Sequence, residues 1–372
     1  MKNSEFTIVG GGVVGLSVAL GLLQTGQQVT VLDGDDSDLR ASQGNFGLIW
    51  LQGKGSYFAP YARWTHRAVT QWPNFAESLE SLSGVNLALD QSGGYEFFTD
   101  SAEFEDFAAD LKQQQAYLGD QSGHEIISGD DLRRTYPEIG EGVAGATFCP
   151  LDGHVNPLRL FSALRSAVLL LGGTIIADTK VTKISPATSG GFTLSASDGQ
   201  RFNTERVILC AGLGTNPLAK QLGFITQVSP QRGELLITEK LSERLPFLSS
   251  TIRQVDEGGI QIGGTKEDAG LNDSETLDVM AKLAKHAVAV YPQLADVRMV
   301  RAWGALRIIS PDGYPVYAQS PEHSGAYLVT CHSGVTLASL HSTLLAQWLI
   351  DGSNSPTLEA FNESRFALSV AA

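Results

Sequence analysis

The chain has 372 residues, 42% of them hydrophobic, and a formal net charge of −14 at pH 7. A chain of this size can bury a sizeable core, and its length predicts two domains. The negative charge argues against binding to nucleic acid or to an anionic membrane surface, because both repel an acidic protein.

The sequence contains three cysteines, Cys149, Cys210 and Cys331. Their wide spacing excludes an iron–sulfur or zinc site ligated by cysteines, so no metal is expected, and it fits a reducing compartment. The first expected strand begins near residue 5, which leaves no room for a signal peptide. The longest apolar run is interrupted by Arg159 and Arg165. We therefore expect a cytoplasmic protein without a transmembrane segment.

The N-terminal stretch predicts a β-α-β unit. A strand over 5–9 leads into Gly10-Gly-Gly-Val-Val-Gly15, an apolar helix follows, and a second strand over 28–32 ends at Asp33. Gly10 permits a tight turn, Gly12 lets the backbone approach a pyrophosphate, and Gly15 lets helix and strand pack closely. Val13 and Val14 begin a helix whose N-terminus favours an anion.

Asp33 is placed to accept hydrogen bonds from a ribose hydroxyl. The alternative is a glycine-rich turn without a ligand, but the complete unit favours a dinucleotide. It does not distinguish NAD from FAD. In the segment after Asp33, the small residues Ser42, Asn45 and Gly47 suit a loop beside a ligand, although their composition alone favours ordinary turn chemistry.

The remaining pattern predicts an α/β fold with a doubly wound, Rossmann-like domain and a discontinuous α+β substrate domain on a mostly antiparallel sheet. We place the first domain in residues 1–82, 146–224 and 302–372, and the second in 83–145 and 225–301. Asn156 and Pro157 predict a helix start, with the helix ending at Gly172. Other helices are expected over 64–82, 102–118 and 273–291, and strands over 93–98, 174–178, 192–197, 206–210, 224–238 and 250–264.

Arg307 is the strongest candidate for ligand binding near the C-terminus. Strand alternation places it on one face with Trp303, Ala305 and Ile309. A buried arginine is costly unless it meets an anion. From spacing alone, the favoured interpretation is that Arg307 forms an internal salt bridge with an acidic residue of the chain.

The glycine motif together with Ala41-Ser-Gln-Gly-Asn-Phe-Gly47 resembles the D-amino-acid oxidase class of flavoproteins, which includes glycine oxidase and sarcosine oxidase. Within this class, the stretches 45–54 and 331–336 most resemble the small flavin subunits of opine oxidases, with the hydrogen cyanide synthase flavin subunit and D-hydroxyproline dehydrogenases as relatives. Further similar segments are 153–157, 207–212, 230–234, 301–307 and 311–315.

The resemblance implies FAD, and the buried strand that ends before Ala211 and Gly212 supports FAD over NAD. Ala305 stands where sarcosine oxidases carry the cysteine that bonds to the flavin, so we expect non-covalent FAD. Besides the glycine motif and Asp33, the resemblance implies cofactor contacts from Gly34, Arg40, Ser42, Gln43, Asn45, Gly47, Leu48, Val181, Ala211, Gly212, Gly304, Arg307, Ser333, Gly334, Val335 and Thr336.

The family also places an arginine for the substrate carboxylate at the position of Arg307. The family's loop Gly-His-x-Arg-Asn-Gly is shorter here and lacks its arginine, which leaves a second carboxylate contact in doubt. Lys54 and Arg232 are the candidates to replace it, against the favoured alternatives of a solvated lysine and a domain salt bridge. We expect His332 to be a hydrogen-bonding residue near the flavin rather than a general base.

These observations predict oxidation of an amino-acid C–N bond, with an opine or another secondary amino acid as the expected substrate. A hydride passes to the flavin, water hydrolyses the imine, and a larger partner subunit in a hetero-oligomer accepts the electrons; that partner could also bring the chain to a membrane. One alternative is a free-standing glycine or D-amino-acid oxidase that uses oxygen. Another is a flavin-holding electron-transfer subunit without activity of its own.

Overall fold

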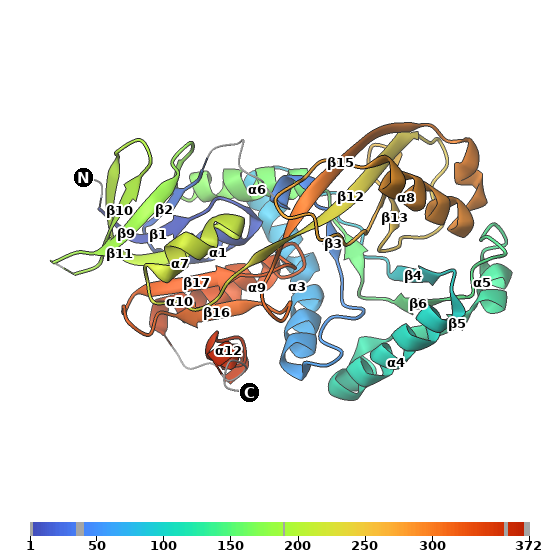
Figure 1. Cartoon of the computed structure of the whole chain (residues 1–372), viewed down its shortest axis with the longest axis horizontal. Helices are drawn as coiled ribbons and strands as arrows, with labels where there is room; N and C mark the ends of the chain where they lie inside the picture. The colour runs from blue at the N-terminus through green and yellow to red at the C-terminus, as the bar shows by residue number, and fades with distance from the viewer. Residues whose placement is uncertain (1–2, 35–40, 189, 353–355, 368–372) are drawn as a thin grey trace.

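The computed structural model describes residues 3–34, 41–188, 190–352 and 356–367. Its largest sheet is built from β1 (Asn3–Val9), β2 (Val29–Leu32), β8 (Thr174–Ile176), β9 (Val181–Pro186), β10 (Phe192–Ala196), β11 (Arg201–Leu209), β16 (Val316–Gln319) and β17 (Ala326–Thr330). The parallel core has the order β17-β11-β1-β2-β8, with β16 antiparallel at one edge and the β9–β10 ribbon attached to β11. This sheet confirms the expected α/β, doubly wound architecture (Figure 1).

Strand β1 and helix α1 (Val13–Gln24) form the predicted β-α-β unit with β2. In β1, Phe6 and Ile8 belong to the hydrophobic cluster on one side of the sheet and Val9 to the cluster on the other side, as strand alternation requires. Every residue of α1 from Gly15 to Leu23 is buried. A helix that is apolar all round must be covered on all sides, and α1 lies between the sheet and further helices.

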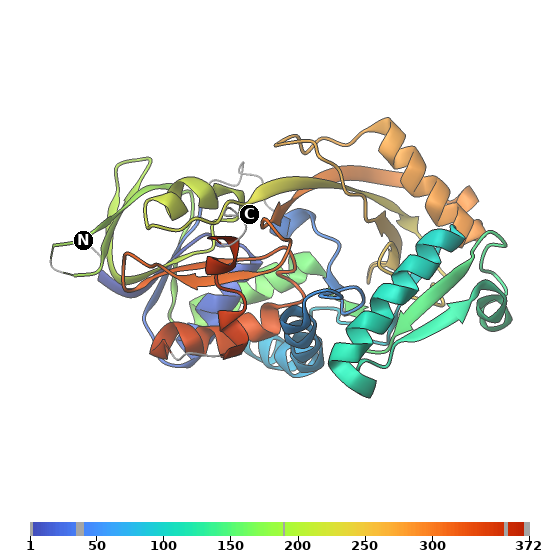
Figure 2. The same cartoon turned by 60° about the horizontal axis from the view of Figure 1, so that its bottom comes forward.

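Helices cover one face of the large sheet, where α6 (Pro157–Leu170), α9 (Ala338–Leu340) and α10 (Ala346–Asp351) contact α1, and α3 (Ala59–Ser83) packs against α6 and α9 (Figure 2). Helix α6 begins as the sequence predicts, because the side chain of Asn156 accepts hydrogen bonds from the backbone of Leu158 and Arg159 at 3.1 and 3.3 Å. The β9–β10 ribbon and α7 (Thr215–Lys220) cover the other face.

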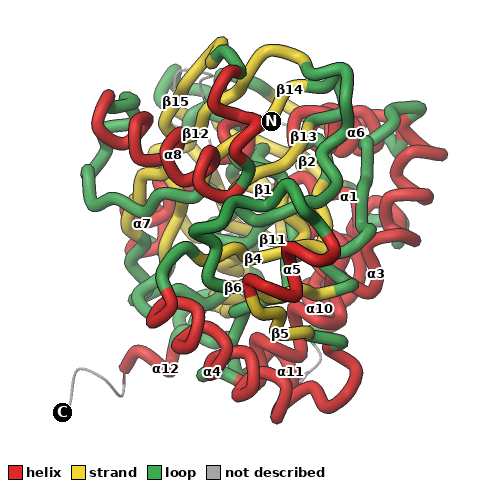
Figure 3. The backbone as a smooth tube through the Cα atoms, turned by 90° about the vertical axis from the view of Figure 1, so that its right-hand side faces the viewer, coloured by secondary structure: helices red, strands yellow, loops and turns green. Residues whose placement is uncertain are grey.

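Two antiparallel sheets form the second part of the molecule. The four-stranded sheet has the order β13 (Ile252–Gln254), β14 (Gly259–Gly263), β12 (Ser229–Lys240), β15 (Met299–Ile309). The three-stranded sheet has the order β4 (Gly94–Phe98), β6 (Gly145–Cys149), β5 (Glu125–Ser128). Leu236, Ile252 and Leu283 belong to a separate hydrophobic cluster here. Helices α4 (Ser101–Leu118), α5 (Gly129–Thr135) and α8 (Leu277–Val290) lie outside these strands (Figure 3).

The long strands β12 and β15 connect the two parts of the molecule, since they run side by side from the large sheet to α8 (Figure 1). The division into two domains by residue ranges, given above from the sequence, stays a proposal. Its borders at 145/146 and 301/302 fall within β6 and β15.

Several sequence-based element boundaries were wrong: the strand expected over 250–264 is the antiparallel pair β13 and β14, and the strand expected over 206–210 is β11, which begins at Arg201. Two other differences have identifiable reasons. The helix expected from residue 273 begins at Leu277, because Glu234 accepts hydrogen bonds from both the backbone and the hydroxyl of Thr276 at 2.9 Å. The strand expected from residue 224 begins at Ser229, because Glu363 accepts the backbone N–H groups that precede it. Such partners, distant in sequence, leave no local signal.

Candidate active site

The glycine loop forms a close turn between β1 and α1. Gly10 has φ +111°, and a Cβ there would collide with the carbonyl oxygen of Cys210 on the neighbouring strand. A Cβ at Gly15 would collide with the carbonyl oxygen of Gly10. The helix N-cap is Gly12, which has no side chain of its own to occupy the N–H groups of the first turn, although Ser42 accepts the N–H of Val13. This helix N-terminus fits the pyrophosphate of a dinucleotide.

Asp33 follows β2 and is 7% exposed. Its Oδ1 accepts the backbone N–H of Gly11 at 2.9 Å, so the carboxylate is tied to the glycine loop. The hydrogen bond of its own backbone N–H to the carbonyl of Ile176 joins it to β8. Gly34 comes next, whereas Arg40 lies outside the described residues. The ribose role of Asp33 stays a prediction.

The segment after these residues folds back over the glycine loop. It contains α2 (Ala41–Gly44) and β3 (Leu48–Ile49), which pairs with β7 (Gly153–His154). The hydroxyl of Ser42 accepts the N–H of Val13 at 3.0 Å, and the side chain of Asn45 bonds to Ser42 and Gly47. These bonds are turn chemistry, as the alternative interpretation held, but they also bring Ser42 to the start of α1. Gln43 is exposed.

The same segment lies against strand β15. Trp303 Nε1 donates to the carbonyl of Gly44 at 3.2 Å, and a Cβ at Gly44 would lie 2.7 Å from the Cβ of Ala305. Gly304 lies on the opposite face of β15, where its missing side chain accommodates the carbonyl of Asp273. Backbone packing therefore explains Gly304 without a ligand.

Ala211 and Gly212 follow β11 after Cys210, next to the turn of Gly10. Gly212 has φ +54°. Val181 starts β9 and is buried in the core on that side of the sheet. Two residues before Val181, Thr179 donates its backbone N–H to the carbonyl of Asp33 at 2.7 Å, so this segment also reaches the end of β2.

The loop 331–336, which follows β17, contacts both the segment that contains β3 and the first turn of α1. The hydroxyl of Thr336 donates to the carbonyl of Leu48 at 3.1 Å, and a Cβ at Gly334 would lie 2.9 Å from Val14 in the first turn of α1. Val335 packs against the main hydrophobic cluster, and Ser333 is buried. Three stretches that are far apart in the sequence thus converge at the start of α1.

Arg307 is half-buried on β15, with its guanidinium over the backbone of Gly233. Its Nη1 donates to the carbonyls of Arg232 and Thr265 at 3.1 and 2.7 Å. Among the described residues, no carboxylate lies within ion-pair distance of it. Burial lowers the pKa of Arg307, partly offset by the more distant Glu267. Backbone oxygens therefore hold this guanidinium, and the internal salt bridge expected from spacing is not formed in the described structure.

Arg232 makes the ion pair instead. Its guanidinium contacts Glu267 at 2.5 Å and Glu234 at 3.5 Å, and it also donates to the carbonyl of Ser274. The arginine is 6% exposed. This salt bridge satisfies Arg232 within its own sheet, as the alternative interpretation expected.

Lys54 and His332 line a cavity of about 230 Å³ together with Tyr61, Tyr314 and the loop 53–57. Lys54 is half-buried rather than fully solvated, and its Nζ donates to the hydroxyl of Ser333 at 3.1 Å. His332 is an exposed residue of the cavity lining. Burial, with Lys54, Arg307 and Lys266 as further causes, lowers the pKa of His332 well below its ordinary value. His332 is therefore neutral at physiological pH.

Sequence reasoning missed three residues in the surroundings of Lys54, which are Tyr61, Glu96 and Lys266. Burial raises the pKa of Glu96, whose carboxylate accepts hydrogen bonds from Trp50 Nε1 and the Ser250 hydroxyl. An acid inside the apolar strand 94–98 is the same kind of signal that identified Arg307 and could have revealed Glu96. Tyr61 and Lys266 carry no comparable signal.

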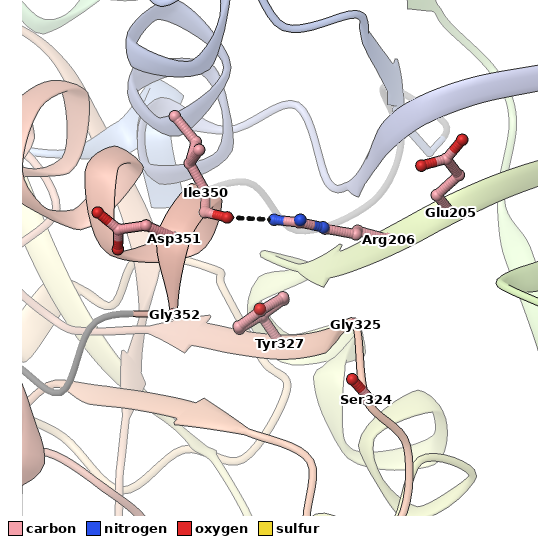
Figure 4. A pocket seen from close by; sticks show the side chains of 8 residues that line it. All are labelled: Glu205, Arg206, Ser324, Gly325, Tyr327, Ile350, Asp351 and Gly352. Carbon is pink, nitrogen blue, oxygen red and sulfur yellow. Dashed lines mark hydrogen bonds between the residues drawn. The ribbon is translucent and has the colours of Figure 1, made fainter.

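A second cavity of about 310 Å³ lies at the opposite end of the large sheet, where β17 begins. Figure 4 shows its lining, in which the guanidinium of Arg206 donates to the carbonyl of Ile350 at 2.7 Å. The same group donates to the carbonyl of Leu349 and thereby caps the end of α10. This cavity is remote from the glycine loop and contains none of the predicted site residues.

Two further features are absent from the part of the chain that the structure describes. No helix there is long and apolar enough to cross a membrane. Within the same residues, no group of three or more histidine, cysteine or acidic side chains is arranged to hold a metal ion. The three cysteines are free and buried.

Comparisons with known proteins agree with this geometry. The family model described as DAO, FAD dependent oxidoreductase, matches residues 5–348. The chain is 38% identical to an opine oxidase subunit of Agrobacterium tumefaciens (strain Ach5) over 369 residues, and 38% identical to the corresponding opine oxidase subunit of Rhizobium meliloti over 367 residues; each alignment covers 98% of both chains. Its fold matches the crystal structure of glycine oxidase from Bacillus cereus ATCC 14579 with a TM-score of 0.86, at 22% identity and 96% and 98% coverage of the two chains. The chain therefore belongs to the DAO family of FAD-dependent oxidoreductases.

Proposed function

We propose that this chain oxidises the C–N bond of a secondary amino acid such as an opine and passes the electrons to a partner subunit. The full-length similarity to an opine oxidase subunit from each of two organisms supports this choice of substrate and of assembly. The cytoplasmic location expected from the three scattered cysteines is part of the same proposal.

The observation that carries the proposal is the incomplete coordination of Arg307. Two backbone carbonyls orient its guanidinium, yet among the described residues no carboxylate neutralises it. A half-buried guanidinium has a planar set of donors that matches a carboxylate in two parallel hydrogen bonds. A carboxylate supplied by a substrate would complete this site.

The residues of the chain contribute mainly alignment. When bound, FAD supplies the acceptor for the hydride that leaves the substrate's α-carbon. The open N-terminus of α1 and Asp33 would hold the dinucleotide, with Ser42 and the loop 331–336 beside it. Arg307 would fix the substrate through its carboxylate, so that the reacting carbon is held in one orientation. Hydrolysis of the resulting imine would give an amino acid and a 2-oxo acid from an opine.

A panel of candidate substrates tests the reaction. The purified flavoprotein is mixed without oxygen with opine-type secondary amino acids, D-amino acids and glycine, and bleaching of the flavin absorbance is recorded. We expect secondary amino acids to bleach the flavin fastest. Bleaching by glycine or D-amino acids alone would favour the oxidase alternative, which the fold similarity to glycine oxidase supports. No bleaching by any amine would favour a flavin-holding subunit.

The electron acceptor requires a separate measurement. Two relatives are named as subunits of an oxidase, and three buried, separate cysteines cannot ligate an iron–sulfur cluster that would carry electrons onward. We therefore expect slow reoxidation by oxygen after fast reduction by substrate. Stopped-flow reoxidation in air-saturated buffer that matches the rate of reduction, with stoichiometric peroxide, would instead identify a free-standing oxidase.

A further inference from the structure

Lys54 is held in a defined position at the cavity of about 230 Å³ that it lines with His332 and Tyr61. Its Nζ donates to the Ser333 hydroxyl at 3.1 Å, and the same hydroxyl lies 2.8 Å from the hydroxyl of Tyr61. The backbone of its loop is fixed by Gln114, whose side chain donates to the carbonyls of Leu51 and Lys54 at 2.9 and 2.6 Å. The amine is therefore anchored at both ends and not a mobile surface lysine.

The charged surroundings of Lys54 are mostly positive. Among the described residues no carboxylate lies within ion-pair distance of its Nζ. Lys266 and Arg307 oppose its charge, whereas Glu96 and Asp152 favour it with smaller effects.

The other ionisable groups around Lys54 do not offset this positive field. The hydrogen bonds of Asp152 go to the backbone of Leu51 and the side chain of Gln52, and burial raises the pKa of Asp152 to about 8. Burial also keeps Tyr61, Cys331 and His332 neutral at physiological pH. At the rim of the cavity, Asp312 is paired with Arg365 and Asp110 accepts the hydroxyl of Tyr57.

Burial is the main cause that lowers the pKa of Lys54, to about 8, and Lys266 and Arg307 add to it. With this pKa about a tenth of Lys54 is neutral at pH 7, with a lone pair on Nζ. When the Ser333 hydroxyl donates its hydrogen to Tyr61, it accepts one from Nζ in either protonation state, and the lone pair of the neutral amine is then free to accept a proton within the cavity.

Oxidation of an amine by hydride loss needs the nitrogen lone pair, which an ammonium group lacks. An aliphatic ammonium group ordinarily loses its proton near pH 10, so only about one molecule in a thousand is neutral at pH 7. An enzyme that works near pH 7 gains from a base that accepts this proton inside the complex.

We propose that Lys54 takes the proton of the substrate's ammonium group and thereby delivers the neutral amine for oxidation. The proposal rests on the amino-acid oxidation proposed above. In this step one N–H bond of the ammonium breaks and a new N–H bond forms at Nζ of Lys54. No electrons are transferred, and one positive charge moves from substrate to lysine. Lys54 returns the proton to solvent before the next cycle.

The rate of anaerobic flavin reduction as a function of pH tests this role in wild type, Lys54→Arg and Lys54→Met, with the amino acid that the panel identifies. Wild type can use the abundant ammonium form, so its efficiency should be level between about pH 8 and pH 10 and fall about tenfold at pH 7. Both variants can use only the neutral amine, so their efficiency should fall tenfold per pH unit below about pH 10. The loss of catalytic efficiency relative to wild type should therefore be about a hundredfold larger at pH 7 than at pH 10 for both variants.

Lys54→Arg is the decisive variant, because arginine keeps the positive charge but cannot act as a base. If Lys54 only attracted a carboxylate, Lys54→Arg would retain wild-type efficiency at pH 7, and that result would overturn the proposal. Ser333→Ala is a matched control that keeps Lys54 and removes the hydroxyl that contacts both Lys54 and Tyr61. We expect it to lower the rate while leaving the inflection near pH 8 in place.

A measurement without turnover separates failure of this proposal from failure of the proposed function. The holoprotein is labelled briefly with an amine-acylating reagent at a series of pH values, and the peptide carrying Lys54 is quantified by mass spectrometry. Reaction of the neutral amine should follow an inflection near pH 8. An inflection near pH 10, as for an exposed lysine, would overturn the proposal even if no substrate in the panel reduced the flavin.

Discussion

Replacement of Arg307 by methionine should reduce catalytic efficiency strongly while leaving FAD bound. Truncating one partner of a buried charge pair costs about 2–5 kcal/mol, or roughly 30-fold to several thousandfold in rate. Because Arg307 is only half-buried, solvent screens part of this interaction. We therefore expect a loss of about a hundredfold, near the lower end of that range.

Stability should change less than activity. The substitution leaves the carbonyls of Arg232 and Thr265 without the Nη1 donor, but β12 and β15 keep their ladder of backbone hydrogen bonds. Because Arg307 is half-buried, we expect water to hydrogen-bond to these carbonyls in place of the guanidinium. Arg307→Lys should recover little activity, since an ammonium group cannot reproduce the planar pair of hydrogen bonds to a carboxylate.

The assay is anaerobic flavin reduction over a range of substrate concentrations, together with flavin content and thermal unfolding. Arg301→Met is a matched control, because Arg301 is an exposed arginine on the same strand whose side chain lies over Trp303. It should reduce flavin at the wild-type rate. If Arg307→Met loses FAD or fails to fold while Arg301→Met does not, the guanidinium holds the structure and the carboxylate role is refuted.

Three further predictions concern the same site. Gly233→Ala places a methyl group against the guanidinium of Arg307, so catalytic efficiency should fall by roughly tenfold to a hundredfold at nearly unchanged melting temperature; wild-type kinetics would show that the position of this group does not matter. Gly10→Ala forces a side chain into a backbone oxygen at φ +111° and should lower both FAD content and melting temperature. Its control is Gly26→Ala, which is also at positive φ (+84°) but has open space around it; this variant should cost only about 1–3 kcal/mol of backbone strain and retain FAD. Equal effects of the two substitutions would contradict the steric argument. Because Ala305 offers no thiol, acid precipitation should release the yellow cofactor into the supernatant, and colour retained in the pellet would demonstrate a covalent bond.

Local sequence patterns determined the elements that depend on neighbouring residues. The turn at Gly10, the helix that follows it and the Asn156 cap of α6 were all predictable, because glycine conformations, caps and apolar periodicity act over a few residues. The resemblance to flavoproteins then identified the family, which the match over residues 5–348 confirms. Alternation along β15 also placed Ala305 and Arg307 on one face of the strand.

Only the tertiary structure decided how these residues are paired. Arg232 and Arg307 are both arginines near apolar strand residues, and the sequence could not tell which one forms a salt bridge; Glu267 pairs with the first because β12 and the segment after β14 lie side by side. The setting of Lys54 likewise depends on Ser333, 279 positions away in the chain. Burial and electrostatic fields arise from atoms that folding brings together, so a pattern of neighbouring residues carries no information about them.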